Sequence, residues 1–251
     1  MVRRPAIRYA FLIFAGIILF STAMIYYNNT ERQFAYVQFP EAWGVIFSLA
    51  SAGVNVFSAI ILVLLVSSEF DWRTGRQNII DGLSRGQWFT ARLLLIPAII
   101  LMLYLPLLVF NVSIALLGTD PSVDTFEITR MQYLAFFGTI IGAMCYSSIA
   151  LLITMIARSA GPALGLTVIY PMFDDTIAKV IKGFEFHDLA DCFPMEVAGA
   201  LFNYSQYYPV GHLRRSWAVH EWDTPMLFFA GLCWITVLII TSWLIYKHRD
   251  L

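Results

Sequence analysis

Long uncharged runs of apolar residues dominate the sequence and are separated by shorter polar segments. Five of them are long enough to cross a membrane as a helix, which needs about 20 apolar residues for a hydrocarbon core about 30 Å thick. These runs are Tyr9–Tyr27, Ala42–Ser68, Leu93–Thr119, Met131–Ala157 and Thr224–Tyr246. A sixth run, Ser159–Phe173, is shorter and must continue past Asp174, Asp175 and Lys179, to about residue 180, to reach across. The pattern therefore predicts six transmembrane helices.

The same runs favour helices over strands, because strands of a membrane barrel are about 10 residues long and alternate strictly. None of these runs alternates. Composition agrees with a lipid environment: 59% of the residues are hydrophobic and 13% are charged, against about 25% charged in soluble domains. We therefore expect an all-α, polytopic membrane protein, with residues 1–251 forming a single transmembrane domain. Basic residues are neither abundant nor pooled, so nothing indicates nucleic-acid binding.

Lys and Arg are distributed unevenly between the predicted helices. If the N-terminus lies inside, the short outer segments hold only Arg32 and Arg130. Ten basic residues then fall inside, namely Arg3, Arg4, Arg8, Arg73, Arg76, Arg85, Arg92, Arg158, Lys247 and Arg249. Cytoplasmic loops carry such an excess. The bias predicts a multi-pass protein with both termini in the cytoplasm, and we expect it in the cell inner membrane.

The inner segment 69–92, between the second and third predicted helices, has an ordered pattern. Glu69 ends one helix, Gly75 allows a turn, and a short amphipathic element follows before Gly86 leads into the next helix. On a helical wheel its apolar residues share one face, and the polar ones point away. The apolar stripe consists of Trp72, Ile79, Ile80 and Leu83, and the polar set is Asp81, Ser84 and Arg85.

This segment resembles the link between the second and third helices in permease subunits of ABC transporters of the type-2 exporter class. The matching residues are Glu69-Phe70, Thr74-Gly75-Arg76, Ile79-Ile80, Ser84-Arg85 and Arg92. In that family the link is a coupling helix that docks into a groove on a cytosolic ATPase subunit. The resemblance implies that ATPase coupling involves Glu69, Arg73, Arg76, Ile79, Ile80, Leu83, Ser84 and Arg85. It also implies a dimer, either of this chain or with a paralogous permease, and ATP and Mg on the partner subunit. The alternative is an ordinary amphipathic inner loop, made basic by the orientation rule.

The predicted outer segment, 183–223, contains nine aromatic residues, too many for a flexible loop. We expect a short helix that starts near Asp191 as N-cap and tolerates Pro194 in its first turn. Its residues Met195, Ala198 and Phe202 would face the membrane. The alternative is an ordered cap over the helices without a ligand.

Two groups of polar residues stand near the outer ends of the helices. Asp174, Asp175 and Lys179 are candidate pathway residues, because ionisable groups inside a membrane are costly, or they stand in the headgroup region. Asp175 and Lys179 have the spacing of an ion pair on one helix face. His187, Asp188, Asp191 and Cys192 are residue types that bind metals, but such a set arises easily by chance, and we predict no metal site.

Several catalytic motifs are missing. The sequence has no G-x-x-x-x-G-K-[ST], so we expect no P-loop ATP hydrolysis by this chain, and it lacks H-E-x-x-H, G-x-S-x-G and C-x-x-C. We therefore expect a transport subunit that is not an enzyme and has no cofactor of its own. The alternatives are an integral membrane enzyme, a secondary transporter or a non-transporting assembly factor.

Overall fold

A computed structural model describes residues 5–32, 42–72, 80–118, 130–203 and 224–248. Within these ranges the chain is helical and contains no strand, which confirms the predicted all-α class. The helices are α1 (Pro5–Arg32), α2 (Ala42–Asp71), α4 (Arg85–Gly118), α5 (Arg130–Ala157), α6 (Ala160–Gly183), α7 (His187–Asp191), α8 (Pro194–Asn203) and α9 (Thr224–His248). Each of the six predicted runs overlaps one of the long helices in the described ranges.

Four of these helices are long and apolar enough to cross a membrane. The qualifying stretches are Gly53–Phe70 in α2, Arg85–Leu117 in α4, Phe136–Ala157 in α5 and Pro225–His248 in α9. Large apolar side chains such as Leu105, Val109 and Phe229 lie on the outside of the bundle, where lipid would cover them. The protein thus has the character of a multi-pass membrane protein. In α1 the apolar stretch of the described residues is shorter, Arg8–Phe20, and spans through α1 and α6 stay predictions.

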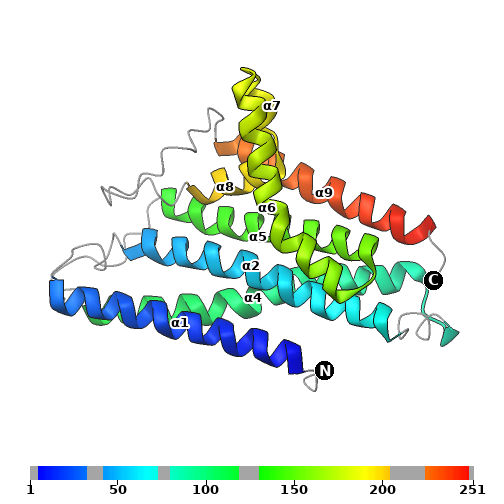
Figure 1. Ribbon diagram of the computed structural model, residues 1–251. Helices are drawn as coiled ribbons and strands as arrows, with labels where there is room; N and C mark the ends of the chain where they lie inside the picture. The colour runs from blue at the N-terminus through cyan, green and yellow to red at the C-terminus, as the bar shows by residue number, and fades with distance from the viewer. Residues whose placement is uncertain (1–4, 33–41, 73–79, 119–129, 204–223, 249–251) are drawn as a thin grey trace.

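Helices α1, α2, α4, α5 and α9 run side by side (Figure 1). The start of α1, the end of α9 and the ends of α2 and α4 that face their connection all lie at the same end of this bundle (Figure 1). Helix α2 packs most extensively against α5. The largest apolar core draws Phe14, Leu62, Ile100 and Leu151 from four different helices. The bundle therefore gathers several helix ends into one place, where the first candidate site lies.

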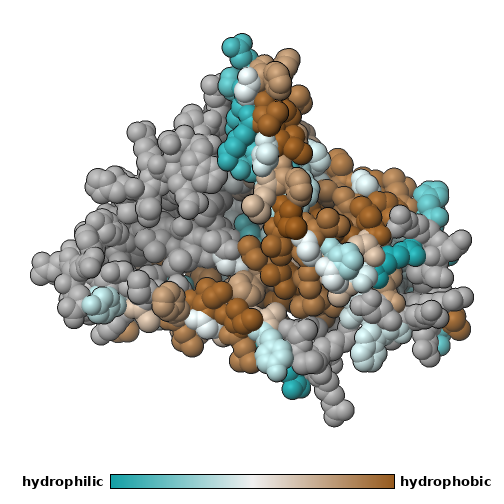
Figure 2. All heavy atoms as spheres, in the orientation of Figure 1, coloured by the Kyte–Doolittle hydropathy of each residue, from teal (hydrophilic) through white to brown (hydrophobic). Residues whose placement is uncertain are grey.

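Helix α6 departs from this arrangement and rises steeply from the bundle, carrying α7 at its far end (Figure 1). Its near half is held by Ala163, which is fully buried, and by Thr167, whose carbonyl accepts a hydrogen bond of 2.7 Å from the Tyr146 hydroxyl of α5. On its far half, apolar residues such as Met172 and Phe173 are exposed. Figure 2 shows apolar residues along one side of the protruding half of α6 and hydrophilic residues along the other side.

Helix α8 packs into the bundle against α5 and α9 because glycines make room for it. A Cβ atom added at Gly138 would lie 2.5 Å from the Leu201 carbonyl oxygen, and one at Gly142 would lie 3.4 Å from that of Ala198. On α9, a Cβ at Gly231 would meet the Leu201 side chain at 3.1 Å. The backbones of α5 and α8 can approach this closely only at positions without a side chain.

The structure corrects three details of the sequence interpretation. The third long helix begins at Arg85 and not at Leu93, because its charged first turns are capped and paired rather than excluded from the helix. Asp191 ends α7 instead of capping α8, since its carboxylate contacts Lys182. Ala198 is 3% exposed and faces the protein, not the membrane. The side chain of Phe202 and residues 204–223 lie outside the described part of the chain.

Candidate functional sites

The ends of α2, α4 and α9 are joined by a group of polar and aromatic residues that we call the end cluster: Glu69, Trp88, Arg92 and Tyr246. One carboxylate oxygen of Glu69 accepts a hydrogen bond of 3.0 Å from the Trp88 indole and forms an ion pair with Arg92. The Arg92 guanidinium also lies over the Trp88 ring, 4.7 Å from its centroid. On its other side Trp88 stacks on Tyr246 at 4.7 Å. Both aromatic residues are buried, so these contacts are shielded from solvent.

Two further arginines stand at the edge of the end cluster. Arg85 donates a hydrogen bond of 3.1 Å to the carbonyl of Lys247, which ties the start of α4 to the end of α9. Arg158, the turning residue between α5 and α6, has a φ of 52°, in the left-handed region that non-glycine residues seldom occupy. Its guanidinium lies 5.7 Å from the centroid of the Phe70 ring of α2. Contacts at this end of the bundle therefore reach α2, α4, α9 and the end of α5.

The short link between α2 and α4 is shaped by a turn and a helix cap. Gly82 has a φ of 107°, which stops the helical turn that includes Ile80. Ser84 and Gln87 then form a capping box: the Ser84 hydroxyl accepts from the Gln87 backbone N–H at 3.2 Å, and the Gln87 side chain accepts from the Ser84 N–H at 2.9 Å. Helix α4 starts at Arg85 for this reason.

The predicted coupling residues are therefore divided among different environments. Glu69 is turned into the bundle, Ser84 caps α4, and Leu83 follows the turn at Gly82 rather than continuing a helical stripe. Trp72, Ile80 and Leu83 are nevertheless exposed, with fractions of 72%, 75% and 42%. Arg73, Arg76 and Ile79 lie outside the described residues. The link thus presents apolar side chains next to an ordered end cluster.

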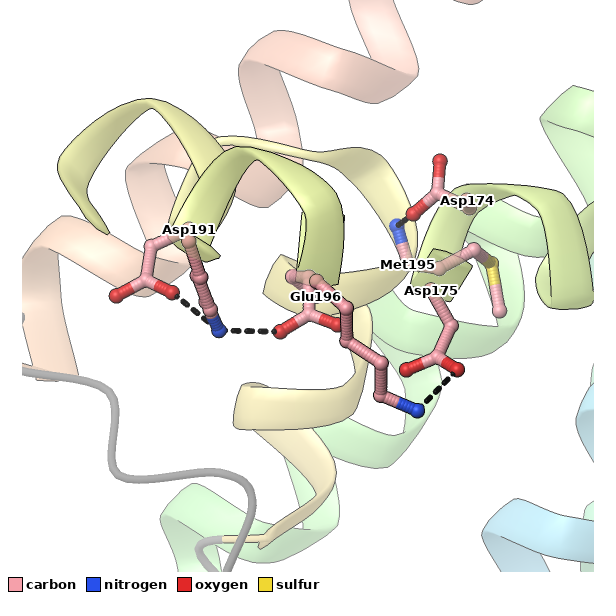
Figure 3. Close-up of polar contacts among 7 residues, drawn as sticks. Asp174, Asp175, Asp191, Met195 and Glu196 are labelled. Carbon is pink, nitrogen blue, oxygen red and sulfur yellow. Dashed lines mark hydrogen bonds and ion pairs between the residues drawn. The ribbon is translucent and has the colours of Figure 1, made fainter. Parts of the chain in front are cut away.

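A second group of ionisable residues lies where α6, α7 and α8 meet, and we call it the junction cluster: Asp174, Asp175, Lys179, Lys182, Asp191 and Glu196. The predicted pairing of Lys179 with Asp175 is confirmed by a distance of 2.6 Å between their charged atoms. Lys182 bridges two carboxylates, at 2.9 Å from Asp191 and 3.1 Å from Glu196 (Figure 3). Asp174 is 3% exposed and accepts hydrogen bonds from the Tyr170 hydroxyl at 2.9 Å and the Met195 backbone N–H at 3.1 Å.

Burial and neighbouring charges shift the pKa of Lys182 and of the adjacent Cys192 thiol. Partial burial alone would lower the pKa of Lys182, but the hydrogen bonds and charges of Asp191 and Glu196 outweigh it, and the pKa is raised. Burial, together with the charges of Asp191 and Asp188, raises the pKa of the Cys192 thiol. No group of three His, Cys, Asp or Glu residues gathers into a metal-binding arrangement within the described ranges.

Sequence reasoning missed Trp88, Lys182 and Glu196. The Ser84-x-x-Gln87 spacing is a capping-box signature that could have placed the start of α4 and, with it, Trp88 inside a helix. The bridge from Lys182 to Glu196 joins different helices, and no local pattern in the sequence indicates it.

No protein-family model matches the chain, and no curated protein sequence matches it either.

Proposed function

We propose that the chain is the membrane-spanning permease subunit of an ATP-driven exporter of the ABC type-2 class. In this proposal it crosses the inner membrane six times with both termini in the cytoplasm. Two permease subunits, either two copies of this chain or this chain with a paralogue, form the substrate pathway. Separate cytosolic ATPase subunits bind ATP and Mg and dock beneath them. The chain itself carries out no covalent chemistry.

The link between α2 and α4 is the observation that carries the proposal. Its exposed Trp72, Ile80 and Leu83 are large apolar side chains on a short connection at one end of the bundle. A contiguous apolar surface marks an interaction site, and three large exposed apolar side chains on one connection are candidates for part of such a surface. Their position matches that of the coupling helix in the family that the sequence resembles. A groove on an ATPase would bury them, with Ile80 and Leu83 as anchors.

The end cluster supports the proposal because it supplies a route for mechanical coupling. The Glu69–Arg92 ion pair and the Glu69–Trp88 hydrogen bond fasten the two helices that flank the link. Stacking of Trp88 on Tyr246 and the Arg85–Lys247 hydrogen bond extend the connection to α9. A force on the link would therefore move the ends of three helices together rather than bending one loop, as rigid-body switching requires.

The junction cluster fits a role along the pathway better than acid–base catalysis. Lys179 occupies one oxygen of Asp175, and Lys182 occupies one oxygen each of Asp191 and Glu196. Carboxylates engaged in ion pairs of this kind are typical of a structural or positioning role. We therefore retain Asp174, Asp175 and Lys179 as proposed pathway residues and do not favour the membrane-enzyme alternative.

The test is purification of the affinity-tagged chain from its native membrane in a mild detergent, with untagged membranes as the control. We expect a P-loop ATPase without membrane spans to co-purify in near-stoichiometric amount, and the complex to hydrolyse ATP. If instead the purified chain alone, in vesicles, transports its cargo down an ion gradient, the proposed function is wrong.

A further inference from the structure

The Tyr246 hydroxyl in the end cluster finds no hydrogen-bond partner among the described residues. The residue is only 1% exposed, so bulk solvent does not supply one. Its ring stacks on Trp88 at 4.7 Å and lies 6.2 Å from the ring of Phe89, which fixes the position of the hydroxyl. A buried donor without an acceptor is costly, and in folded proteins it usually has a partner, which can be a water or an ion.

Positive charge surrounds this hydroxyl. Arg85 stands beside it, because its guanidinium donates to the carbonyl of Lys247, the next residue after Tyr246. Among the described residues, the charges that act on Tyr246 are those of the cations Arg85, Arg92 and Arg158 and of the carboxylate Glu69. An acceptor for the hydroxyl is therefore more stable here as an anion than as a neutral group.

The end cluster also lies at the level where the apolar helices end. The apolar stretch of α2 ends at Phe70, that of α4 begins at Arg85, and that of α9 ends at His248. Two tryptophans and a tyrosine gather at this level, since Trp88 stacks on Tyr246 and Trp243 lies 6.0 Å from it. Trp and Tyr are typical of the headgroup level of a membrane. Phospholipid phosphates occupy the same level.

We propose that the end cluster, together with Arg85, is a binding site for a phosphate group, either that of an anionic phospholipid or a free phosphate ion. The phosphate oxygens accept from the Tyr246 hydroxyl and from the Arg85 guanidinium, which suits phosphate because it is always charged and donates as a fork. Arg92 and Arg158 stabilise the anion through their charge. Arg85 is exposed, so it can turn outward to admit the phosphate. This inference does not depend on the ATPase partner.

A purely structural role for the arginines predicts something different. Cations stabilise the carbonyl groups at the C-terminal end of a helix, as Arg85 does at Lys247 of α9. That role needs no hydroxyl at position 246. Tyr246→Phe therefore separates the two roles, because phenylalanine keeps the ring that stacks on Trp88 and loses only the hydroxyl.

The experiment uses the full chain, delipidated in a nonionic detergent and without a partner. Native mass spectrometry gives its apparent affinity for phosphatidylglycerol, and phosphatidylcholine, whose headgroup has no net charge, is the comparison. A second arm measures the melting temperature in inorganic phosphate and in chloride at equal ionic strength. The variants are Tyr246→Phe and Arg85→Gln. The matched controls are Tyr133→Phe and Lys179→Gln, which change exposed residues outside the end cluster.

We expect wild type to bind phosphatidylglycerol about tenfold more tightly than Tyr246→Phe, the size of one hydrogen bond to a charged group. The two controls should match wild type, and phosphatidylcholine should show no difference between wild type and Tyr246→Phe. Without added phospholipid or phosphate, Tyr246→Phe should melt no lower than wild type, because its hydroxyl has no protein partner to lose. Arg85→Gln should also weaken binding and reduce its dependence on salt.

The two arms distinguish the source of the phosphate. If inorganic phosphate raises the melting temperature of wild type more than that of Tyr246→Phe, the site binds free phosphate, which supports the same chemistry. Equal responses of wild type and Tyr246→Phe to phosphatidylglycerol and to inorganic phosphate would overturn the proposal. If Tyr246→Phe does not fold, Arg85→Gln decides, and an affinity equal to that of wild type would exclude the site.

Discussion

At the scale of single residues, Glu69 belongs to the predicted coupling motif and also joins two helices of the bundle. From the sequence we predicted that Glu69 ends a membrane helix and begins the proposed coupling segment. In the structure it accepts from Trp88 and pairs with Arg92, and its side chain is 16% exposed. A half-buried carboxylate in contact with a guanidinium and an indole holds helix ends together. Its effect on an ATPase partner would thus act through the position of the link.

Replacing Glu69 by Gln should destabilise the protein, because Arg92 would keep its charge in a half-buried site without its carboxylate. We expect a loss of about 2 kcal/mol, as for a charged hydrogen bond, which lowers the melting temperature by about 4 to 8 °C. Thermal unfolding in detergent measures this. Asp81→Asn, which removes an exposed carboxylate from the adjacent turn, should change little. Equal melting temperatures for both variants would contradict the assigned role of Glu69.

Lys182 gives a prediction for alkaline pH. Its pKa in the folded protein is raised above the ordinary value of 10.5, because Asp191 and Glu196 outweigh burial. The stabilisation is therefore fully present below pH 10.5 and is lost as the pH rises through the folded pKa. Wild type should melt about 2 °C above Lys182→Gln at pH 9.5, and the difference should vanish well above pH 10.5. The same comparison with Lys179→Gln, whose side chain is 60% exposed, serves as control. A difference that persists undiminished at high pH would exclude the charged bridge as its source.

At the scale of elements, apolar runs predicted the long helices well, and their ends poorly. The runs are broken at charges, so Arg85 and Arg92 appeared to lie before the third helix. In the structure both belong to α4, since Ser84 caps it and Glu69 pairs with Arg92. Helix α8 was predicted from its aromatic surroundings and from Pro194. Its close packing against α5, however, depends on Gly138 and Gly142. A glycine in a membrane helix does not reveal which partner approaches it.

Gly138→Ala directly tests the close packing of α8 against α5. The added methyl would lie 2.5 Å from the Leu201 carbonyl oxygen, so α8 must move away from α5. We expect a cost of about 1 to 3 kcal/mol, as for overpacking in a core, seen as a lower melting temperature. Gly165→Ala is the matched control: a Cβ there meets nothing within 4 Å, and alanine favours the helix. If both variants were equally stable, the close contact of α5 with α8 would be wrong.

At the scale of the whole molecule, composition and apolar runs sufficed for an all-α membrane protein. The four apolar helices α2, α4, α5 and α9 support this. The steep course of α6 and the bridge from Lys182 to Asp191 and Glu196 could not be predicted, because they depend on contacts between different helices. Six spans and their orientation stay predictions, as does the ATPase partner. The end cluster and the exposed link are the structural features on which the proposed ATPase partner rests.

The most direct test of the proposed function asks whether the α2–α4 link binds an ATPase. If Ile80 and Leu83 are anchors, each should cost more than about 1 kcal/mol when truncated. Ile80→Ala combined with Leu83→Ala should then weaken ATPase recovery about tenfold or more, since about 1.4 kcal/mol is one decade. The measurement is a pull-down from detergent at matched expression. Leu116→Ala with Leu117→Ala, exposed apolar residues near the other end of α4, should recover as much ATPase as wild type. Equal recovery from the Ile80/Leu83 variant and wild type would contradict the assignment to the ABC exporters.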